Sequence, residues 1–242
     1  VKNNVEVTLE ANPSSYEVEK FKAFKQAGIN RVSIGVQSFN EDNLKFLGRL
    51  HDKNQAIAAI ESAGNLFDNF SFDLIYSLPK QNMDEWQKEL DFALKFNTPH
   101  LSLYQLTIEK GTKFYSDYNK GKFEMPEEEI STDMYLATVE ACANKGLNRY
   151  EISNFAKLGK ECEHNLSYWR YNNYIGIGPG AHGRIEEGNE NLEARKVAYY
   201  NIHNPENWLK EVEGNNFAIQ QKQILDADEV VKEKIYMGLR TK

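Results

Sequence analysis

The chain has 242 residues, of which 40% are hydrophobic and 27% charged, and this balance is typical of a globular protein that buries a core. The formal net charge of −7 argues against binding to nucleic acid or to an anionic lipid surface, because either partner needs a basic face. Two cysteines, Cys142 and Cys162, cannot build a disulfide scaffold. They also cannot hold an iron–sulfur cluster by themselves, since a cluster normally takes several thiolates. No apolar run approaches the roughly 18 to 20 residues of a membrane span.

The chain starts at Val1 without an initiator methionine, and a strand-like run follows almost at once. The first residues lack the basic, apolar and small-residue pattern of a signal peptide. We therefore expect the sequence to be a piece of a longer protein, and we expect a cytoplasmic location.

Runs of β-branched and apolar residues in the first 110 residues predict four strands, at residues 5–10, 31–37, 70–76 and 101–107. The polar ends of successive strands are separated by roughly the 30 residues of a strand–helix–strand unit. This spacing predicts parallel strands joined by right-handed crossovers.

The stretches between these strands carry apolar residues at helical spacing, together with start and stop patterns of helices. Ser14 and Asn82 each precede a glutamate at the spacing of a capping box, and Asp52 opens a third helix. Gly28 is expected to end the helix that follows Ser14, and Gly64 the helix that Asp52 opens.

The alternation of strand-like and helix-like segments ends after Thr107. Residues 109–129 are expected to form a loop, and a helix is expected to begin near Pro126 and to end at Gly146. A short strand is expected at 149–152. From about residue 185 the chain is polar, with helical stretches expected around Trp208 and at 226–239.

Polar side chains gather at the predicted carboxyl ends of the strands, which is where ligands bind in parallel α/β folds. Glu10, Gln37 and Thr107 stand at such ends, Asp73 lies within its strand near one, and Arg49 follows the second strand after a short turn. Carboxylates accept hydrogen bonds from ribose hydroxyls or an ammonium group, and arginine binds a carboxylate through two nitrogens. The set is therefore suited to a zwitterionic ligand that carries a ribose.

Each of these residues, taken alone, is equally typical of a solvated strand end or a helix cap. The functional interpretation depends on their recurrence at consecutive strand ends. No residue is assigned a catalytic role, and no metal site is predicted.

Several motifs resemble the HemN/HemW branch of the radical S-adenosylmethionine (SAM) superfamily, which comprises oxygen-independent coproporphyrinogen III oxidase and the heme chaperones. The resemblance covers nearly the whole chain. The motifs that carry it are Leu9-Glu-Ala-Asn-Pro13, Ser33-Ile-Gly-Val-Gln-Ser-Phe-Asn40, Leu47-Gly-Arg49, Phe72-Asp-Leu-Ile-Tyr-Ser-Leu-Pro-Lys-Gln81 and Leu101-Ser-Leu-Tyr-Gln-Leu106.

The resemblance implies a partial (β/α)6 barrel of the TIM type, here with about four strand–helix units followed by an α+β extension. It also implies that Glu10, Gln37, Arg49 and Asp73 bind SAM, with Thr107 as a weaker candidate. The family's cluster-binding motif, Cys-x-x-x-Cys-x-x-Cys, is absent from this sequence. A [4Fe-4S] cluster is therefore expected only in a longer parent protein, and the chain alone is expected to be inactive.

The stretch His164-Asn-Leu-Ser-Tyr-Trp169 resembles a signature of the heme chaperones HemW rather than of the oxidases. Neutral imidazole is a common axial ligand of heme iron, and aromatic rings pack well on a porphyrin face. His164, Tyr168 and Trp169 are therefore candidates for a heme site. A structural turn, in which the histidine is satisfied by hydrogen bonds and the two aromatic rings are partly buried, is the alternative.

Three functions stay open at this point. The first is a fragment of a HemW-like protein that binds heme and delivers it to an acceptor, with membrane proteins among the candidate acceptors. The second is a coproporphyrinogen III oxidase, which decarboxylates its substrate through a radical derived from SAM. The third is a structural or interaction module without a cofactor.

Residues 1–110 are expected to be the carboxyl-terminal part of the barrel, and residues 111–242 the extension. Barrel strands missing from the fragment would leave an open sheet edge, which favours pairing between two copies of the chain. A homodimer is therefore an expectation, whereas a nucleic-acid partner is not.

Overall fold

The computed structural model describes residues 5–189 and 192–241. The chain divides into two compact units, Val1–Glu161 and Cys162–Lys242, and each is described by itself. The domain boundary expected near residue 110 stays a prediction.

The first unit is built on a six-stranded sheet with the order β1-β2-β3-β4-β6-β5. Its strands are β1 (Thr8–Ala11), β2 (Arg31–Gln37), β3 (Phe70–Tyr76), β4 (His100–Gln105), β5 (Asn148–Arg149) and β6 (Asn154–Ala156). Strands β1 to β4 are parallel, as the spacing predicts, whereas β6 runs antiparallel to both β4 and β5. The predicted bounds of β2 and β3 are confirmed, and β1 lies at one edge of the sheet.

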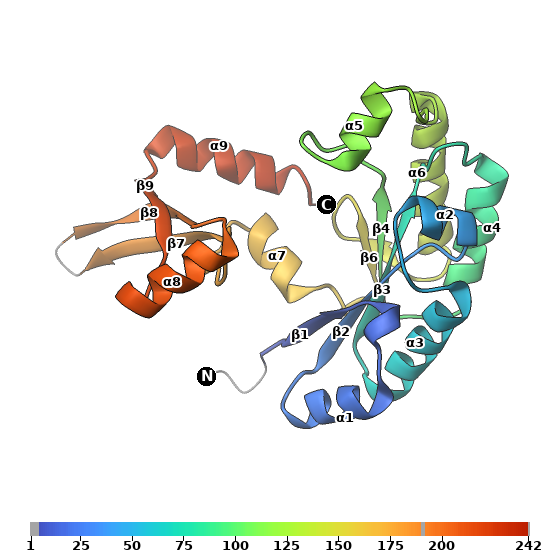
Figure 1. Cartoon of the computed structure of the whole chain (residues 1–242), viewed down its shortest axis with the longest axis horizontal. Coiled ribbons are helices and arrows are strands. Elements are labelled where there is room, and N and C mark those ends of the chain that lie inside the picture. Colours follow the sequence, from blue (N-terminus) through green and yellow to red (C-terminus); the bar gives the residue numbers. More distant parts are fainter. Residues whose placement is uncertain (1–4, 190–191, 242) are drawn as a thin grey trace. The chain divides into compact units, whose positions relative to one another are not determined.

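Helices cover one face of this sheet (Figure 1). The unit contains a short 3-10 helix at Pro13–Ser15 and the helices α1 (Val18–Gln26), α2 (Glu41–Phe46), α3 (Lys53–Leu66), α4 (Met83–Leu94), α5 (Lys113–Asn119) and α6 (Glu128–Ala143). Alternate strand residues, such as Ile34, Phe72 and Leu101, are buried in a core that also holds Trp86 of α4 and Met134 of α6. Burial of this apolar face is the main term that favours folding of the unit.

Most helix starts follow the sequence pattern. Asp52 and Asn82 each form a capping box with the residue three positions on, as expected. The pattern at Ser14 is misleading, since α1 begins only after Glu17, which makes no side-chain cap. Gly28 ends α1 with a φ of 107°, whereas Gly64 lies inside α3, and a Cβ there would lie 3.2 Å from the Phe70 ring. Gly64 therefore allows close packing of α3 on the sheet rather than ending the helix.

The segment expected to be a loop at 109–129 contains helix α5. Thr112 caps this helix, because its hydroxyl accepts a hydrogen bond from the Tyr115 amide at 3.2 Å. The Phe114 ring packs on Phe46 at the end of α2, with 5.1 Å between ring centroids. A contact over such a separation in sequence stabilises a helix that a local pattern does not reveal.

The second unit contains a three-stranded antiparallel sheet that the sequence pattern does not predict. Its elements are α7 (Glu163–Trp169), β7 (His182–Asn189), β8 (Leu192–Asn201), α8 (Pro205–Asn215), β9 (Ile219–Ile224) and α9 (Ala227–Gly238). The helices expected around Trp208 and at 226–239 are confirmed. The strands were missed because β9 is exposed along its whole length and rich in glutamine, so it lacks apolar alternation.

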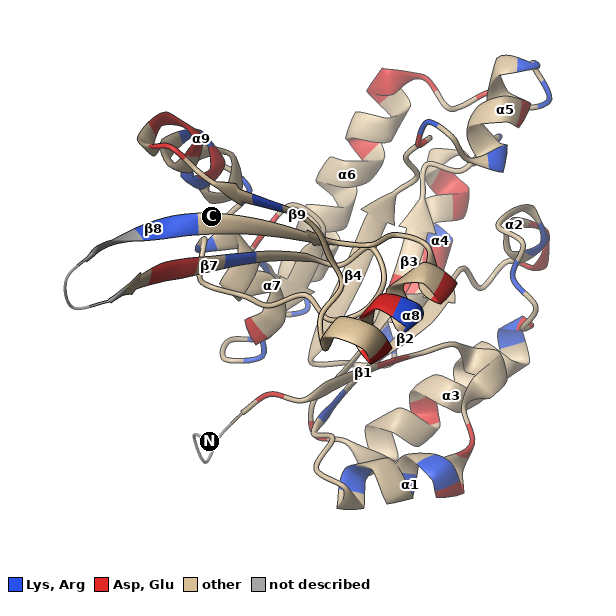
Figure 2. Ribbon diagram, turned by 60° about the vertical axis from the view of Figure 1, so that its left-hand side comes forward, with Lys and Arg blue, Asp and Glu red and all other residues tan. Residues whose placement is uncertain are grey.

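Acidic and basic residues are interspersed over the helices of both units (Figure 2). Within the described ranges, no helix is long and apolar enough to cross a membrane.

Candidate functional site

The sheet of the first unit carries polar residues on the face opposite to the apolar core. Its strands alternate, so that Glu10, Ser33, Ser71, Asp73 and Ser102 fall on one face. The register brings them together in pairs across neighbouring strands, with Glu10 beside Ser33, Ser33 beside Ser71, and Asp73 beside Ser102. A row of acids and hydroxyls therefore runs across the parallel strands.

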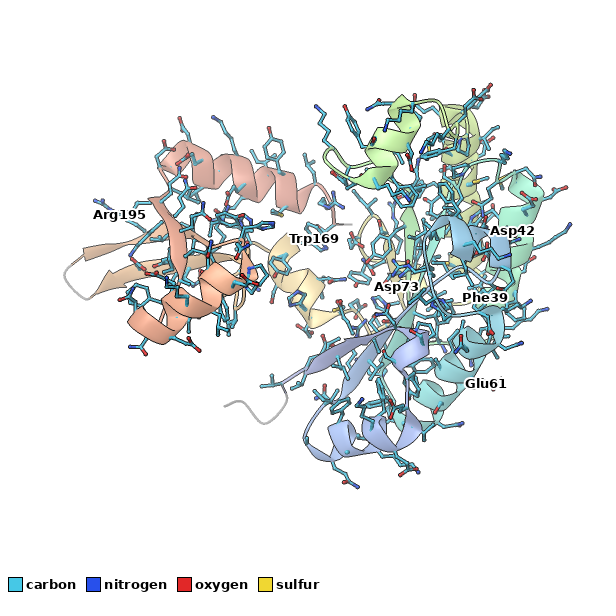
Figure 3. The ribbon with its side chains drawn as sticks, viewed as in Figure 1. Phe39, Asp42, Glu61, Asp73, Trp169 and Arg195 are labelled. Carbon is cyan, nitrogen blue, oxygen red and sulfur yellow. The ribbon has the colours of Figure 1, made fainter. Side chains whose placement is uncertain are left out.

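Asp73 is the centre of this polar face (Figure 3). Its carboxylate accepts a hydrogen bond from Ser33 Oγ at 3.3 Å and another from Ser102. Burial raises the pKa of Asp73 from 3.8 to about 6, and the nearby Glu10 carboxylate adds to this rise. A carboxyl group whose pKa is moved toward neutrality by burial and by a second acid is a common mark of a functional site.

A chain of hydrogen bonds links Asp73 to a buried arginine at the start of β2. Arg31 is 3% exposed, and its Nη2 donates to Ser71 Oγ at 2.9 Å. The hydroxyl of Ser71 lies 2.8 Å from that of Ser33, which in turn donates to Asp73. The charge of the guanidinium lowers the pKa of Asp73, but burial raises it by more.

Gln37, the last residue of β2, adopts a left-handed backbone conformation with a φ of 70°. The Ser38 amide donates to the Val36 carbonyl at 2.9 Å, which closes a three-residue turn with Gln37 at its centre. Such a turn is rare and strained. Gly35 leaves room for the side chain, since a Cβ there would lie 2.9 Å from Gln37 Nε2. The strained turn and the glycine therefore place the Gln37 carboxamide over the polar face.

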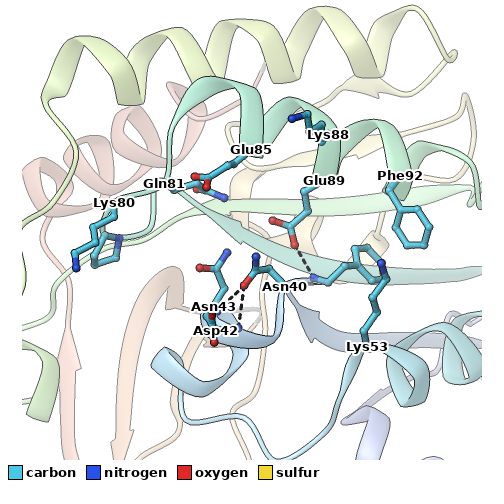
Figure 4. Close-up of a pocket in the computed structure, with 12 residues that line it drawn as sticks. Asn40, Asp42, Asn43, Lys53, Lys80, Gln81, Glu85, Lys88, Glu89 and Phe92 are labelled. Carbon is cyan, nitrogen blue, oxygen red and sulfur yellow. Dashed lines mark hydrogen bonds between the residues drawn. The ribbon is translucent and has the colours of Figure 1, made fainter.

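Glu89 of α4 holds the residues that follow this turn (Figure 4). Its carboxylate accepts hydrogen bonds from Ser38 Oγ at 2.6 Å and from the Phe39 amide at 2.5 Å. Burial raises the pKa of Glu89, while these donors and Lys53 oppose the rise. Figure 4 also shows Asn40, whose side chain caps α2. The sequence pattern did not single out Glu89, because a glutamate in the middle of a helix carries no local signal.

Glu89→Gln is expected to loosen the turn that presents Gln37. A neutral amide is a weaker acceptor than a carboxylate, so the Phe39 amide should exchange its hydrogen about tenfold faster. Hydrogen exchange followed residue by residue measures this. Asp91→Asn, an exposed change on the same helix, is the control and should leave residues 38–40 unchanged. Equal exchange at Phe39 in the wild-type chain and in Glu89→Gln would show that the carboxylate does not hold the turn.

Arg49 and Thr107 lie at the same end of the sheet but outside the hydrogen-bonded row. Arg49 follows Gly48, which ends α2 in a left-handed conformation, with the Arg49 amide donating to the Leu44 carbonyl at 2.9 Å. Thr107 is exposed beyond the end of β4. Among the described residues, no hydrogen bond or ion pair joins either side chain to Glu10, Gln37 or Asp73.

The candidate heme residues all lie on or at the end of α7, in the second unit. His164 is exposed, and its ring lies 4.7 Å from that of Tyr168, one turn further along the helix. Tyr168 also contacts Tyr174, with 4.4 Å between ring centroids. The Arg240 guanidinium lies over the Trp169 ring, 4.6 Å from the ring centroid. An exposed imidazole beside a tyrosine ring is accessible to a heme iron, and the same geometry fits a surface aromatic cluster.

Comparison with known proteins supplies the class of the first unit. Residues 1–93 match the family model of the Radical SAM superfamily. The structure of coproporphyrinogen III oxidase (HemN) from Escherichia coli superposes with a TM-score of 0.79, at 20% identity, over 98% of this chain and 55% of that one. The parallel sheet and its helices therefore have the HemN radical SAM fold, and the expected α/β class is confirmed.

Similar proteins with curated names show the branch of the superfamily to which the chain belongs. A radical S-adenosyl methionine domain-containing protein 1, mitochondrial, from Danio rerio is 39% identical over 97% of this chain and 53% of its own length. The heme chaperone HemW of Bacillus subtilis is 35% identical over 97% of this chain and 60% of its own length. HemW of Escherichia coli is 43% identical over 75% of this chain and 47% of its own length. The resemblance to the HemN/HemW branch is confirmed, and the chain spans about half the length of these relatives, between 47% and 60%.

The superfamily implies SAM and a [4Fe-4S] cluster, and the residues present fit only the first. Two acids and a carboxamide on one polar face, Glu10, Asp73 and Gln37, match the ammonium and ribose hydroxyls of SAM. The residues present cannot ligate the cluster, because Cys142 and Cys162 are buried in different units. In the part of the chain that the structure describes, no three metal-binding side chains come together.

Proposed function

We propose that the chain is the SAM-binding part of a HemW-like heme chaperone and contributes residues to its heme site. The main support is the 35–43% identity to proteins named heme chaperone HemW, extending over 75–97% of the chain. The likeness to the oxidase HemN is one of fold, at 20% identity. A cytoplasmic location and pairing between copies of the chain are parts of the same proposal, although the relative from Danio rerio is named as mitochondrial.

In this proposal the polar face of the sheet binds and orients SAM. Glu10 and Asp73 accept hydrogen bonds from its ammonium group and ribose hydroxyls, and Gln37 donates and accepts through one carboxamide. Arg49, exposed just after α2, is the candidate for the SAM carboxylate, with Thr107 as a weaker contact. When bound, SAM supplies a methionine and an adenosyl group.

Heme is the cargo, and His164 is the proposed iron ligand. The imidazole of His164 is exposed, so iron can reach a ring nitrogen without rearrangement of α7. Tyr168 offers an aromatic face one turn away. Trp169 has an indole N–H that is buried without a hydrogen-bond partner among the described residues, which marks it as a group for which a bound molecule would provide an acceptor.

His164→Ala is expected to weaken heme binding at least tenfold and to change the Soret band, because the iron loses an axial ligand. Absorbance titration of the chain with hemin measures both effects. His203→Ala, at another exposed histidine of the same unit, is the matched control and should bind hemin like the wild-type chain.

Two results would contradict this proposal. If His164→Ala leaves both the affinity and the spectrum unchanged, the ligand assignment is wrong. If the full-length parent protein, with its cluster reconstituted, converts coproporphyrinogen III under anaerobic conditions in a SAM-dependent reaction, the parent is an oxidase rather than a chaperone.

A further inference from the structure

A hollow of about 560 Å³ lies within the first unit, apart from the polar face of the sheet. It is formed where the end of α2, the start of α5 and the segment after α5 meet. Three half-buried phenylalanine rings line it, with Phe46 at 5.1 Å from Phe114 and 5.2 Å from Phe123. Cavities of roughly 300 to 1,000 Å³ with aromatic walls are typical of small-molecule sites.

The charges around this hollow, which we call the aromatic pocket, are not balanced. Lining residues include Asp42 and Asp117, but each already pairs with a lysine: Asp42 with Lys45 at 3.4 Å, and Asp117 with Lys122 at 2.6 Å. Two further lining lysines, Lys80 and Lys113, are exposed and make no hydrogen bond or salt bridge to any described residue. Lys113 is near enough to help lower the pKa of Asp117, but not in ion-pair contact with it.

Lys80 occupies a position that normally favours glycine. The Gln81 amide donates to the Leu78 carbonyl at 3.0 Å, which closes a turn with Pro79 and Lys80 at its centre. Lys80 has a φ of 65°, and at the third position of such a turn glycine or asparagine is preferred. The turn thus carries a cation at a strained position, and strained backbone positions tend to occur at binding sites.

We propose that the aromatic pocket binds a flat conjugated molecule with carboxylate groups, its rings on Phe46, Phe114 and Phe123 and its carboxylates on Lys80 and Lys113. Aromatic walls favour a conjugated ring, and two cations without acidic partners complement two carboxylates. The identity of the ligand as a tetrapyrrole with propionate side chains rests on the proposed function, whereas the pocket and its charges do not. All residues of this site belong to the first unit, whereas His164 belongs to the second.

The test is a fluorescence titration of the chain with metal-free protoporphyrin IX, which offers ring and carboxylates but no iron for a histidine. Lys80→Gly and Lys113→Ala are each expected to weaken binding about threefold to fivefold, as for the loss of an exposed ion pair. Lys80→Gly also relieves the strained backbone, so a loss of folding cannot explain weaker binding. Lys120→Ala, an exposed lysine just beyond α5, is the matched control and should change nothing.

A second probe distinguishes the contribution of the aromatic rings to binding from that of the lysine charges. Protoporphyrin IX dimethyl ester lacks the carboxylates, so its binding should be insensitive to both lysine changes. Phe114→Leu, which removes a ring but keeps an apolar side chain, should weaken binding of both probes. The inference is overturned if binding of protoporphyrin IX is the same in the double lysine variant as in the wild-type chain, or if Lys120→Ala weakens it equally.

His164→Ala distinguishes failure of this inference from failure of the proposed function. It should leave the binding of metal-free protoporphyrin IX unchanged. The two lysine changes could still weaken binding of protoporphyrin IX while His164→Ala leaves hemin binding unchanged. That result would overturn the proposed heme ligand alone. Loss of the lysine effect with an intact His164 effect would overturn the aromatic pocket alone.

Discussion

Asp73→Asn is expected to raise the free energy of unfolding at pH 8 by about 1 to 2 kcal/mol and to leave it nearly unchanged at pH 4. Burial raises the pKa of Asp73 from 3.8 to about 6, so the folded chain favours the protonated acid. That contribution to stability is fully present below pH 3.8 and is lost as the pH rises through about 6. Asparagine removes the buried charge, and its Oδ1 still accepts hydrogen bonds from Ser33 and Ser102.

Urea unfolding of the wild-type chain and Asp73→Asn at pH 4, 6 and 8 measures this difference. Asp84→Asn, an exposed change at the start of α4, is the control and should show no such pH dependence.

The same Asp73 variant should bind SAM more weakly, because it loses the carboxylate on the polar face. A variant that gains stability while losing ligand affinity is the signature of a residue kept for function. Destabilisation at pH 8 would contradict the assignment.

Gly176→Ala is expected to destabilise the second unit by about 3 kcal/mol, at the upper end of the usual cost of overpacking. A Cβ at position 176 would lie 2.0 Å from the His182 carbonyl oxygen, a backbone atom that cannot swing aside. The approach is this close because Tyr174 and Arg184 bridge the two segments through hydrogen bonds of 2.7 and 2.9 Å. An added methyl group must therefore separate the bridged segments.

Thermal or urea unfolding measures the cost, with Gly214→Ala as the matched control. Gly214 lies in α8 with open space around it, so alanine there should be neutral or stabilising by up to about 1 kcal/mol. Similar stability of the two variants would mean that residues 174–176 and 182–184 do not approach as closely as described.

The sequence was most informative where local pattern and long-range packing agree. The strands at 31–37 and 70–76 are buried and rich in β-branched and aromatic residues, and their bounds were predicted correctly. The caps at Asp52 and Asn82 were also predicted, because a capping box depends only on residues three positions apart. The parallel order followed from the spacing of the strands.

Prediction failed where the cause is packing or pairing with another element rather than the local sequence pattern. Gly64 is expected from the sequence to end a helix, but a glycine is needed there because the Phe70 ring packs against its backbone. Helix α5 was read as a loop because its partner ring, Phe46, lies on another helix. The hairpin sheet of the second unit was missed, since a polar exposed strand such as β9 is stabilised by its hydrogen bonds to a neighbour rather than by burial.

The candidate site shows the same division. Glu10, Gln37 and Asp73 could be named from the sequence because acids and amides at the ends of parallel strands carry a recognisable pattern. The residues that support them could not be named. The hydrogen bonds that link Arg31 through Ser71 and Ser33 to Asp73, and those from Glu89 to the turn after Gln37, join residues 38 or more positions apart. Such supports determine the orientation of the side chains that meet the ligand.

The proposed roles of Glu10, Gln37 and Asp73 depend on binding of SAM to the polar face of strands β1 to β4. A titration of the isotope-labelled chain with SAM, followed through backbone amide chemical shifts, tests it most directly and tolerates weak binding in the absence of a cluster. We predict shifts concentrated at residues 10–12, 35–38, 73–74 and 102–105, and their loss in Asp73→Asn. Shifts confined to other surfaces, or none up to millimolar SAM, would contradict SAM binding at this face.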